Sequence, residues 1–314
     1  MKVQVPPGKY VLAVSSGVDS MTLLHLLAKQ AKSSKPKAQS QNQDRPSYQL
    51  PANGLQLVVA HFDHGIRGDS TKDEALVRST VASYGLVYEA GEGNLGPSTG
   101  EAVAREARYE FLEIAMKKHQ AKAIITAHHQ DDLIETAFIN LIRGTRRKGL
   151  SAISSNTKVL RPLLNTPKTD ITAYARRHKL EWLEDATNQD TKYLRNYLRI
   201  KILPSLSGVQ RQSLISNIDK VAKTNIKIDH VFATISHSTD IENIDRNFFS
   251  ALPAELGDEL VAYLLRQASV ADFDSKTVNR LSMAIKTSKS NSIHPVKRNT
   301  SLKVDTKTAR LVTP

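Results

Sequence analysis

The sequence contains no cysteine and few aromatic side chains, with a single Trp and only 5% Phe, Trp and Tyr among its 314 residues. Without cysteine the chain can form neither a disulfide framework, nor a thiolate zinc site, nor a thiol nucleophile. No apolar run approaches the roughly 18 residues of a membrane-spanning helix, and the N-terminus lacks the long apolar segment of a signal peptide. We therefore expect a cytoplasmic protein without membrane contact.

Positive charge is what the sequence has in excess, with 44 Lys and Arg against 31 Asp and Glu and a formal net charge of +13. The excess is uneven, because residues 1–142 hold 15 of each sign whereas residues 143–204 hold 14 basic and 5 acidic residues. Residues 276–314 hold 9 basic residues and 1 acidic residue. Lys and Arg on solvated helix faces would explain part of this charge. Its concentration in residues 143–204 and 276–314 nevertheless favours a polyanion bound by the C-terminal half of the chain.

Short apolar segments alternate with segments of helical periodicity in the first part of the chain. The expected strands are residues 9–14, 55–60, 86–90 and 123–127, and the expected helices are residues 21–32, 71–84, 101–120 and 131–143. This alternation predicts an α/β fold in which helices flank a parallel sheet. The polar, low-complexity segment 33–53 is expected to be a surface insertion.

The pattern changes after about residue 205. Apolar positions recur at helical spacing over residues 207–287, and residues 292–314 alternate as in a small sheet or a loose tail. We therefore predict two domains, a catalytic domain over residues 1–204 and a smaller, mainly helical domain with a basic tail over residues 205–314, which we expect to contact a polyanion.

Three polar clusters follow the predicted strands. They read SSGVDS at residues 15–20, HFDHGIR at residues 61–67 and HHQDD at residues 128–132. Ligands of parallel sheets bind beyond the carboxyl ends of the strands. The three clusters are therefore expected to share one site.

The first cluster joins a strand to a helix, so it offers backbone N–H groups and the positive end of a helix dipole to an anion. It matches neither the Walker A pattern nor G-x-G-x-x-G. A carboxylate beside a polyphosphate is repulsive unless a cation lies between them, and Mg²⁺ on Asp19 would supply it. A simple turn with Asp19 as helix cap is equally consistent with these residues. The expected nucleotide-binding residues are Ser15, Ser16, Gly17, Val18, Asp19 and Ser20.

This loop resembles the S-G-G-x-D-S pyrophosphate loop of the N-type ATP pyrophosphatases, the PP-loop family. The resemblance implies an adenine nucleotide alpha hydrolase-like fold and an enzyme that cuts ATP between the α and β phosphates. Such enzymes adenylate a carbonyl oxygen and release pyrophosphate. Ser16 stands where the family has Gly, which would cost roughly 1 kcal/mol if the position required a positive φ.

Further motifs follow in order, and together they resemble the tRNA(Ile)-lysidine synthase family. The matching segments are residues 61–67, 101–109, 126–136, 143–144, 149–150, 161–164, 185–188, 195–196, 199 and 203–204. The resemblance implies a ligase that uses ATP and Mg²⁺ to join free L-lysine to C2 of the cytidine at the first anticodon position of tRNA(Ile) with a CAU anticodon. The products would be lysidine, AMP and pyrophosphate, formed through an adenylated tRNA. Cysteine-dependent tRNA thiolases of the PP-loop group are excluded.

The resemblance also implies roles for single residues. Asp19 would hold Mg²⁺, and Arg105 or Arg108, three apart on one helix face, would contact the α-phosphate, with Arg105 preferred. Asp132 and Glu135, also three apart, would bind the ammonium group of lysine. From the residues alone, an arginine paired with a helix Glu and two exposed acids near a helix N-terminus remain open alternatives.

The basic middle segment is expected to bind tRNA phosphates. The residues singled out for this contact are Arg146, Arg147, Lys148 and Arg195. Two other functions remain open, a metal-dependent phosphohydrolase that uses the His and Asp clusters and a noncatalytic tRNA-binding relative. The sequence leaves the oligomeric state undecided, a homodimer being one option.

Overall fold

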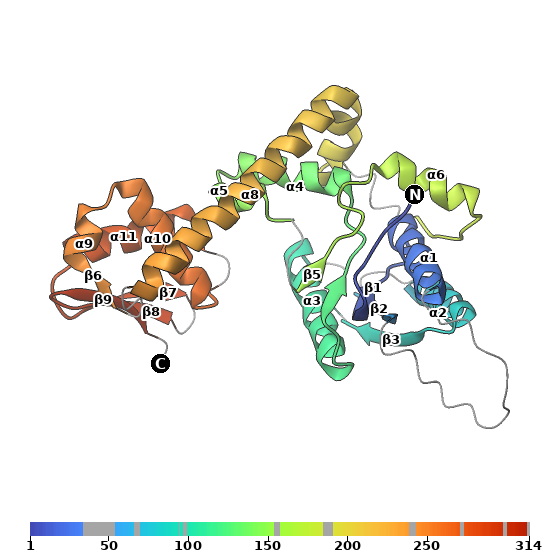
Figure 1. Cartoon of the computed structure of the whole chain (residues 1–314), viewed down its shortest axis with the longest axis horizontal. Helices are drawn as coiled ribbons and strands as arrows, with labels where there is room; N and C mark the ends of the chain where they lie inside the picture. Colours follow the sequence, from blue (N-terminus) through green and yellow to red (C-terminus); the bar gives the residue numbers. More distant parts are fainter. Residues whose placement is uncertain are drawn as a thin grey trace. The chain divides into compact units, whose positions relative to one another are not determined.

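A computed structural model describes residues 1–33, 54–65, 70–93, 95–96, 99–153, 158–184, 191–238, 243–270, 273–297 and 300–312 (Figure 1). The chain forms two compact units. The first comprises residues 1–136 and 153–215, and the second comprises residues 137–152 and 216–314. Of the predicted surface insertion, residues 34–53 lie outside the described residues.

The first unit is built on a five-stranded parallel sheet with the strand order β3-β2-β1-β4-β5. The strands are β1 (Gly8–Ala13), β2 (Leu55–Asp63), β3 (Val87–Glu92), β4 (Ala123–Ile125) and β5 (Val159–Leu160). The chain winds from β1 outward through β2 to β3 and then returns to the other side of β1. The carboxyl ends of β1 and β4 therefore border the crevice at which parallel sheets bind ligands.

Helices connect the first strands and follow the last one. In the first unit they are α1 (Val18–Ser33), α2 (Ser70–Tyr84), α3 (Glu101–Lys118), α6 (Lys168–Arg177) and α7 (Leu194–Tyr197), followed by a π-helical turn (Leu198–Ile202) and a 3₁₀ turn (Leu203–Ser205). The chain passes between the units within α4 (Gln130–Ile142) and within α8 (Gly208–Ser238). None of the described helices combines the length and apolarity needed to cross a membrane.

The sheet is covered on both faces because successive side chains of each strand point to opposite sides. Tyr10 and Leu12 of β1 belong to a core shared with α1, α2 and α6, whereas Val11 packs with Leu112 and Ala115 of α3. Burial of each such aliphatic side chain contributes about 1.5–3 kcal/mol. The continuous apolar runs of the strands thus reflect two buried faces.

The predicted α/β class with a parallel sheet is confirmed, and the strands differ mainly in length. β2 continues past its apolar run because the backbone of His61–Asp63 pairs with Ala90–Glu92 of β3. β5 was not predicted, since it contributes only Val159 and Leu160 and leaves no periodic signal in the sequence.

The second unit is mainly helical and carries a small antiparallel sheet in the order β6-β9-β8-β7. Its elements are α5 (Arg147–Leu150), β6 (Ile244–Asp245), α9 (Arg246–Ala251), α10 (Ala254–Gln267), α11 (Ser275–Thr287), β7 (Ser292–Lys297), β8 (Thr300–Val304) and β9 (Thr308–Val312). Phe249, Leu265, Val278 and Leu302 lie in its core. The alternating pattern of the last residues therefore reflects a sheet and not a loose tail.

The compact units divide the chain differently from the predicted domains. Residues 137–152 belong to the second unit although the chain returns to the first unit after them. The first unit continues to Ile215, beyond the predicted boundary at Leu203–Pro204. That boundary stays a prediction, and no pattern in the sequence indicated that residues 137–152 would belong to the second unit.

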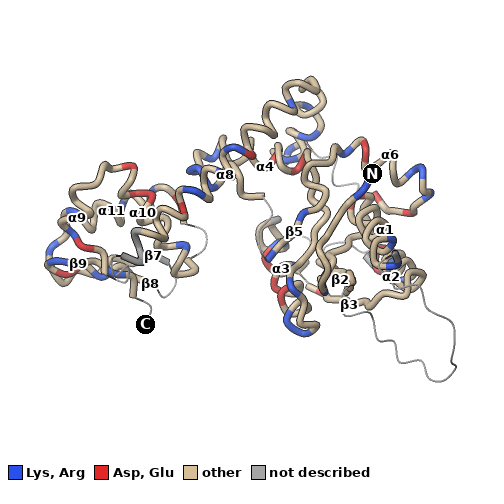
Figure 2. Tube along the Cα trace, in the orientation of Figure 1, with Lys and Arg blue, Asp and Glu red and all other residues tan. Residues whose placement is uncertain are grey.

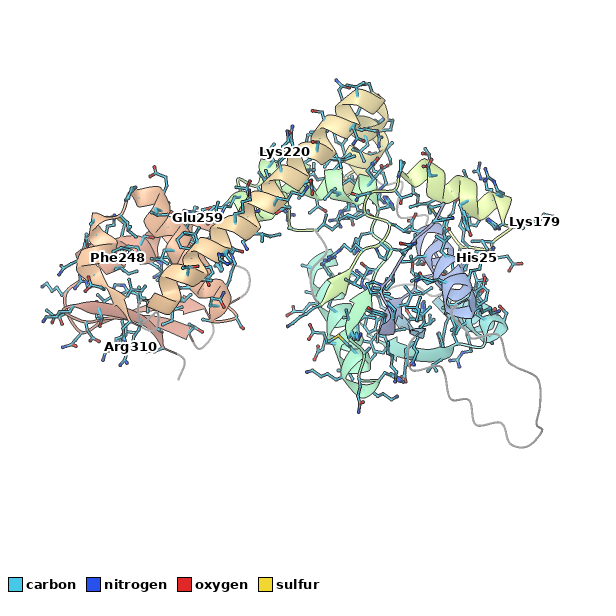
Figure 3. The ribbon with its side chains drawn as sticks, in the orientation of Figure 1. His25, Lys179, Lys220, Phe248, Glu259 and Arg310 are labelled. Carbon is cyan, nitrogen blue, oxygen red and sulfur yellow. The ribbon has the colours of Figure 1, made fainter. Side chains whose placement is uncertain are left out.

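His25 lies on α1 (Figure 3) and contacts side chains of α2 and of α6 with its C-cap residue. Its Nδ1 lies 2.7 Å from the hydroxyl of Tyr84 on α2, and its ring is 5.9 Å from the ring of Tyr174 on α6 and 5.2 Å from that of His178. Burial, followed by the charges of Lys29 and His178, lowers the pKa of His25 from 6.5 to about 4.

The depressed pKa of His25 predicts a loss of stability in mild acid. Between pH 6.5 and 4 the unfolded chain takes up a proton at this position that the folded chain does not, so the free energy of unfolding falls as the pH falls through this window. Urea unfolding at pH 7 and pH 4.5 should show a smaller acid loss for His25→Gln than for the wild type. The exposed His230→Gln serves as control, and an equal acid loss in all three proteins would contradict the assignment.

Candidate active site

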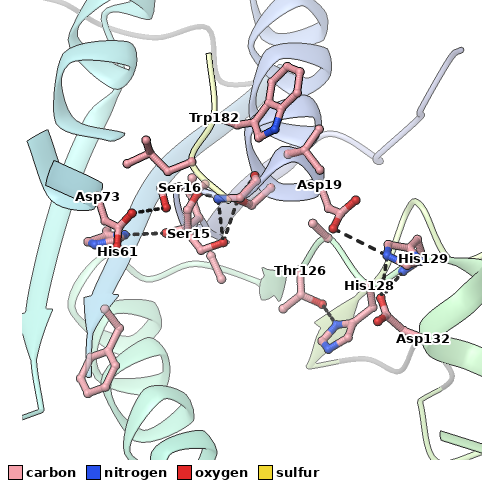
Figure 4. Close-up of a pocket in the computed structure, with 18 of the residues that line it drawn as sticks. Ser15, Ser16, Asp19, His61, Asp73, Thr126, His128, His129, Asp132 and Trp182 are labelled. Atoms are coloured by element: carbon pink, nitrogen blue, oxygen red, sulfur yellow. Dashed lines mark hydrogen bonds and ion pairs between the residues drawn. The ribbon is translucent and has the colours of Figure 1, made fainter. Parts of the chain in front are cut away.

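A cavity of about 970 Å³ opens at the carboxyl ends of β1, β2 and β4 (Figure 4). Ser15–Ser20, Ala60–His64 and Thr126–His129 line it, together with Arg108 and Lys168 from two helices. The three polar clusters predicted to share a site therefore do share one cavity. Its volume is at the upper end of the range for pockets that enclose a small ligand.

The loop at residues 15–20 leads directly into α1. The Ser20 hydroxyl donates to the carbonyl oxygens of Ser15 at 2.5 Å and Gly17 at 3.0 Å, and the Met21 N–H donates to Gly17 O at 3.1 Å. These bonds fix the loop from within. The N–H groups of the first turn of α1 have no acceptor within the helix, and they bring the positive end of its dipole to the cavity.

Ser16 is held by two contacts in this loop. Its hydroxyl donates to Oδ1 of Asp73 on α2 at 2.5 Å, and its carbonyl accepts the Leu183 N–H at 2.9 Å. Among the described non-glycine residues, positive φ angles occur at Gln120, Lys179, Ser269 and Asn291, and thus not at Ser16. The backbone strain that serine would suffer at a position of positive φ therefore does not arise. The Ser16 hydroxyl instead gains a hydrogen-bond partner that glycine would lack.

Asp19 lies between two cationic or potentially cationic groups. Both of its carboxylate oxygens accept from Lys168 Nζ at 2.6 Å, and Oδ2 is 3.6 Å from Nε2 of His129. Burial alone would raise the pKa of Asp19, but His129 and Lys168 hold this pKa below its usual range. The sequence offered no signal for Lys168, because 149 residues separate it from Asp19.

His129 links Asp19 to Asp132. Its Nδ1 accepts the backbone N–H of Asp131 at 3.2 Å, so in the neutral ring the proton sits on Nε2, which lies 3.4 Å from Asp132 Oδ2. The backbone N–H of His129 also donates to Asp132 Oδ2, at 2.9 Å. Burial opposes protonation of His129, but the hydrogen bond to Asp19 and the charges of both carboxylates raise its pKa.

The donor set around Asp19 fits Mg²⁺ that arrives with a polyphosphate. In the described part of the chain no three His, Asp or Glu side chains are grouped as a metal site. A divalent ion on Asp19 would therefore take its remaining oxygen ligands from phosphates and water, as Mg²⁺ commonly does. The metal-dependent phosphohydrolase alternative requires a fuller set of protein ligands, so the side chains do not favour it.

Glu135 is fully buried and bonded to an arginine. Its two oxygens accept from Nε and Nη2 of Arg199 at 2.8 and 2.9 Å, and Oε2 lies 3.9 Å from Nε of Arg195. Arg199 also approaches Asp132 at 3.3 Å. Burial raises the pKa of Glu135 despite the opposing effect of Arg199. Asp132 and Arg199 line the cavity, whereas Glu135 lies behind them.

Three arginines act electrostatically on His128, another residue of the cavity wall. Burial and the charges of Arg161, Arg108 and Arg105 lower the pKa of His128 to about 3, although Asp132 opposes them. The Thr126 hydroxyl lies 2.8 Å from His128 Nδ1. Arg108 lines the cavity and Arg105 does not. The geometry thus favours Arg108 over Arg105 for a phosphate contact, and sequence reasoning had not placed Arg161 at this site.

Arg146, Arg147 and Lys148, singled out for tRNA binding, are paired with acids of the second unit. Arg146 bonds to Asp258 at 2.6 Å, Arg147 to Glu259 at 2.9 Å and Asp229 at 3.1 Å, and Lys148 to Asp229. Three carboxylates thus offset three positive charges, and the contacts hold α5 to α8 and α10. A role of these three residues in tRNA binding stays a prediction.

Comparison with known proteins identifies related sequences. Residues 2–206 match the family model of the PP-loop domain. The tRNA(Ile)-lysidine synthase of Thermotoga maritima is 32% identical over 251 residues, which are 77% of this chain and 55% of that protein. The enzyme of that name from Nitrosomonas europaea is 31% identical over 283 residues, 85% of this chain and 57% of that protein. The chain thus spans a little more than half the length of these relatives.

Among solved structures, the U34-tRNA thiolase NcsA from Methanococcus maripaludis, with its [4Fe-4S] cluster, superposes with a TM-score of 0.54. The match covers 70% of this chain and 74% of the thiolase at 16% identity, so it shows a common fold and no more. The present chain has no cysteine to hold such a cluster.

The Glu135–Arg199 pair predicts strong coupling in a double-mutant cycle. Glu135→Gln and Arg199→Met should each lower the free energy of unfolding by about 1.5–3 kcal/mol, because each removes charge-assisted hydrogen bonds. The double variant should lose clearly less than the sum, since the pair is lost only once. Arg195→Met, in which a longer 3.9 Å contact is removed, should have a smaller effect. Additive losses in urea unfolding would show that the pair does not act as a unit.

Proposed function

Because the chain belongs to the PP-loop domain family, we propose that it is an ATP-dependent ligase that joins free L-lysine to a cytidine of tRNA(Ile). The cytidine is that at the first position of a CAU anticodon, and the products are lysidine, AMP and pyrophosphate. The names of the relatives from Thermotoga maritima and Nitrosomonas europaea support this substrate. A cytoplasmic location and a homodimer stay predictions.

One observation carries the proposal. A single cavity combines a phosphate-binding loop with an acidic metal position, an arginine for a phosphate, and a carboxylate beside a second arginine. These residues are the loop Ser15–Ser20, Asp19, Arg108, Asp132 and Arg199. ATP and a zwitterionic amino acid both find complementary charges there. A hydrolase would have no use for the amino-acid contacts.

In the first step the C2 carbonyl oxygen of the cytidine forms a bond to the α-phosphorus of ATP. The bond from this phosphorus to the bridging oxygen breaks, and pyrophosphate leaves. The loop N–H groups and Arg108, together with the charges of Arg105 and Arg161, stabilise the charge that develops on the α-phosphate and the leaving group. Mg²⁺ bound to Asp19 would neutralise phosphate charge.

In the second step the ε-amine of lysine attacks C2, the C2–O bond breaks and AMP leaves. Asp132 binds the substrate ammonium, and Arg199 offers the positive charge that the substrate carboxylate needs. Glu135 positions Arg199 from behind and does not itself meet the substrate, which revises the predicted lysine-binding pair. The amine has an ordinary pKa near 10.4 and must lose its proton to water or to a carboxylate before it attacks.

For tRNA, the second unit offers exposed basic side chains on α11, in the segment between α11 and β7, in the turn before β9 and on β9 as candidates for phosphate contacts. Figure 2 marks Lys and Arg along the chain in blue. The candidate residues are Lys276, Arg280, Lys289, Lys307 and Arg310. They suit phosphates better than Arg146, Arg147 and Lys148, whose charges are already offset. Phosphate contacts of this kind would give tRNA binding a strong salt dependence.

Incubation of the purified protein with ATP, lysine and a tRNA(Ile) transcript bearing CAU tests the proposal. Mass spectrometry of the anticodon fragment should show the addition of one lysine, with release of AMP and pyrophosphate. Asp19→Asn should abolish both products, because the metal position loses its anionic ligand, while the fold measured by circular dichroism is retained. Binding of tRNA without release of AMP would support the noncatalytic alternative, and release of phosphate without lysine addition would support a hydrolase.

Asp132→Asn should separate the two steps. The variant loses a charge-assisted contact to the lysine ammonium, typically about 1.5–3 kcal/mol, so the apparent affinity for lysine should fall roughly 10- to 150-fold. Formation of the adenylated tRNA does not need this contact, so that intermediate should accumulate and be detected by mass spectrometry. If adenylation is lost as completely as in Asp19→Asn, Asp132 belongs to the ATP site instead.

A further inference from the structure

Lys168 is a charged residue of the cavity to which the reaction above gives no part. Its ammonium nitrogen lies 2.6 Å from each carboxylate oxygen of Asp19, so it occupies both oxygens at once. The side chains of Lys168 and Asp19 are 37% and 27% exposed, which places the pair at the wall of the cavity and within reach of solvent.

The backbone at Lys168 is fixed, whereas its side chain has room to move. Lys168 is the first residue of α6, after Pro167 in an extended conformation. The Gln130 N–H donates to Thr166 O at 3.1 Å, and the fully buried Ile171 anchors α6 in the core. Only the four-carbon stem therefore needs to change rotamer for the ammonium to leave Asp19.

Lys168 and a divalent ion would compete for the same oxygens. Two cations on one carboxylate repel each other strongly at such short separations. A metal ion that arrives alone must displace Lys168 without offering it a new partner. A metal ion that arrives with a polyphosphate brings oxygens to which the displaced ammonium can bind.

We infer that Lys168 is an exchangeable partner of Asp19 that moves to the terminal phosphates of the nucleotide when the metal takes its place. This inference rests on the proposed use of ATP and Mg²⁺. Before binding, Lys168 keeps Asp19 ionised and oriented. After binding, it is a phosphate ligand on the leaving pyrophosphate. Metal and nucleotide should consequently bind together far better than either does alone.

Titration with Mn²⁺, with α,β-methylene-ATP and with both probes tests this exchange without any turnover. In Lys168→Met the metal alone should bind roughly tenfold tighter, because its competitor is gone, whereas the nucleotide with metal should bind roughly tenfold more weakly. Lys168→Arg keeps the charge and should stay within a few-fold of the wild type in both measurements. Arg176→Met, an exposed residue of the same helix, is the matched control and should change neither.

The opposite signs of the two effects distinguish the exchange from a purely structural role, which would weaken both affinities together. Metal affinity unchanged or lowered in Lys168→Met, or nucleotide affinity unchanged, would overturn the inference. Lys168→Gln gives a second neutral variant if Lys168→Met does not fold. The same changes in metal and nucleotide affinity are expected for it, and their absence would overturn the inference in the same way. A wild-type protein that binds no α,β-methylene-ATP with Mn²⁺ would contradict the proposed function itself.

Discussion

The alignment of parallel strands is the constraint on which the candidate site depends. All five strands of the first unit run the same way, so the segments after β1, β2 and β4 emerge at one edge of the sheet. The register holds these ends level, since Leu12 pairs with both Val59 and Ile125. Residues more than a hundred positions apart consequently line one cavity, and a slip of one register position would turn the buried faces of a strand outward.

In the cavity and behind its wall, acids are held by cations from other parts of the chain. Asp19 is paired with Lys168, and Glu135 with Arg199. Such pairing orients both carboxylates and holds the pKa of Asp19 below its usual range, whereas burial outweighs Arg199 and raises the pKa of Glu135. The desolvation cost of these pairs is offset only by good geometry. A nucleotide that arrives with its metal can take the place of Lys168 at Asp19, whereas Glu135 keeps Arg199 in position beside Asp132. The site is thus suited to a nucleotide with its metal and to a zwitterionic amino acid, which is the combination that the proposed reaction needs.

Local sequence signals predicted the strands and helices whose buried apolar residues recur at regular spacing. The β1 strand and the phosphate loop were evident from apolar runs and small residues, whereas helical periodicity placed the start of α1 at residue 21 and the structure begins it at Val18. Positive charge was a weaker guide, because the strongest basic cluster, Arg146–Lys148, meets acids of α8 and α10 that lie 81 to 112 residues away. Such long-range pairing leaves no trace in the local composition.

The sequence by itself determined the fold class, the order of the first four strands with the helices between them and the residue types of the phosphate loop, because periodicity and turn chemistry act over a few neighbours. Tertiary structure alone decided which ionisable groups meet. It placed Lys168 on Asp19, put Glu135 behind Arg199, and gave Ser16 a partner in Asp73. The physical reason is that charge and hydrogen bonding act at distances of about 3 Å in space, whatever the separation along the chain.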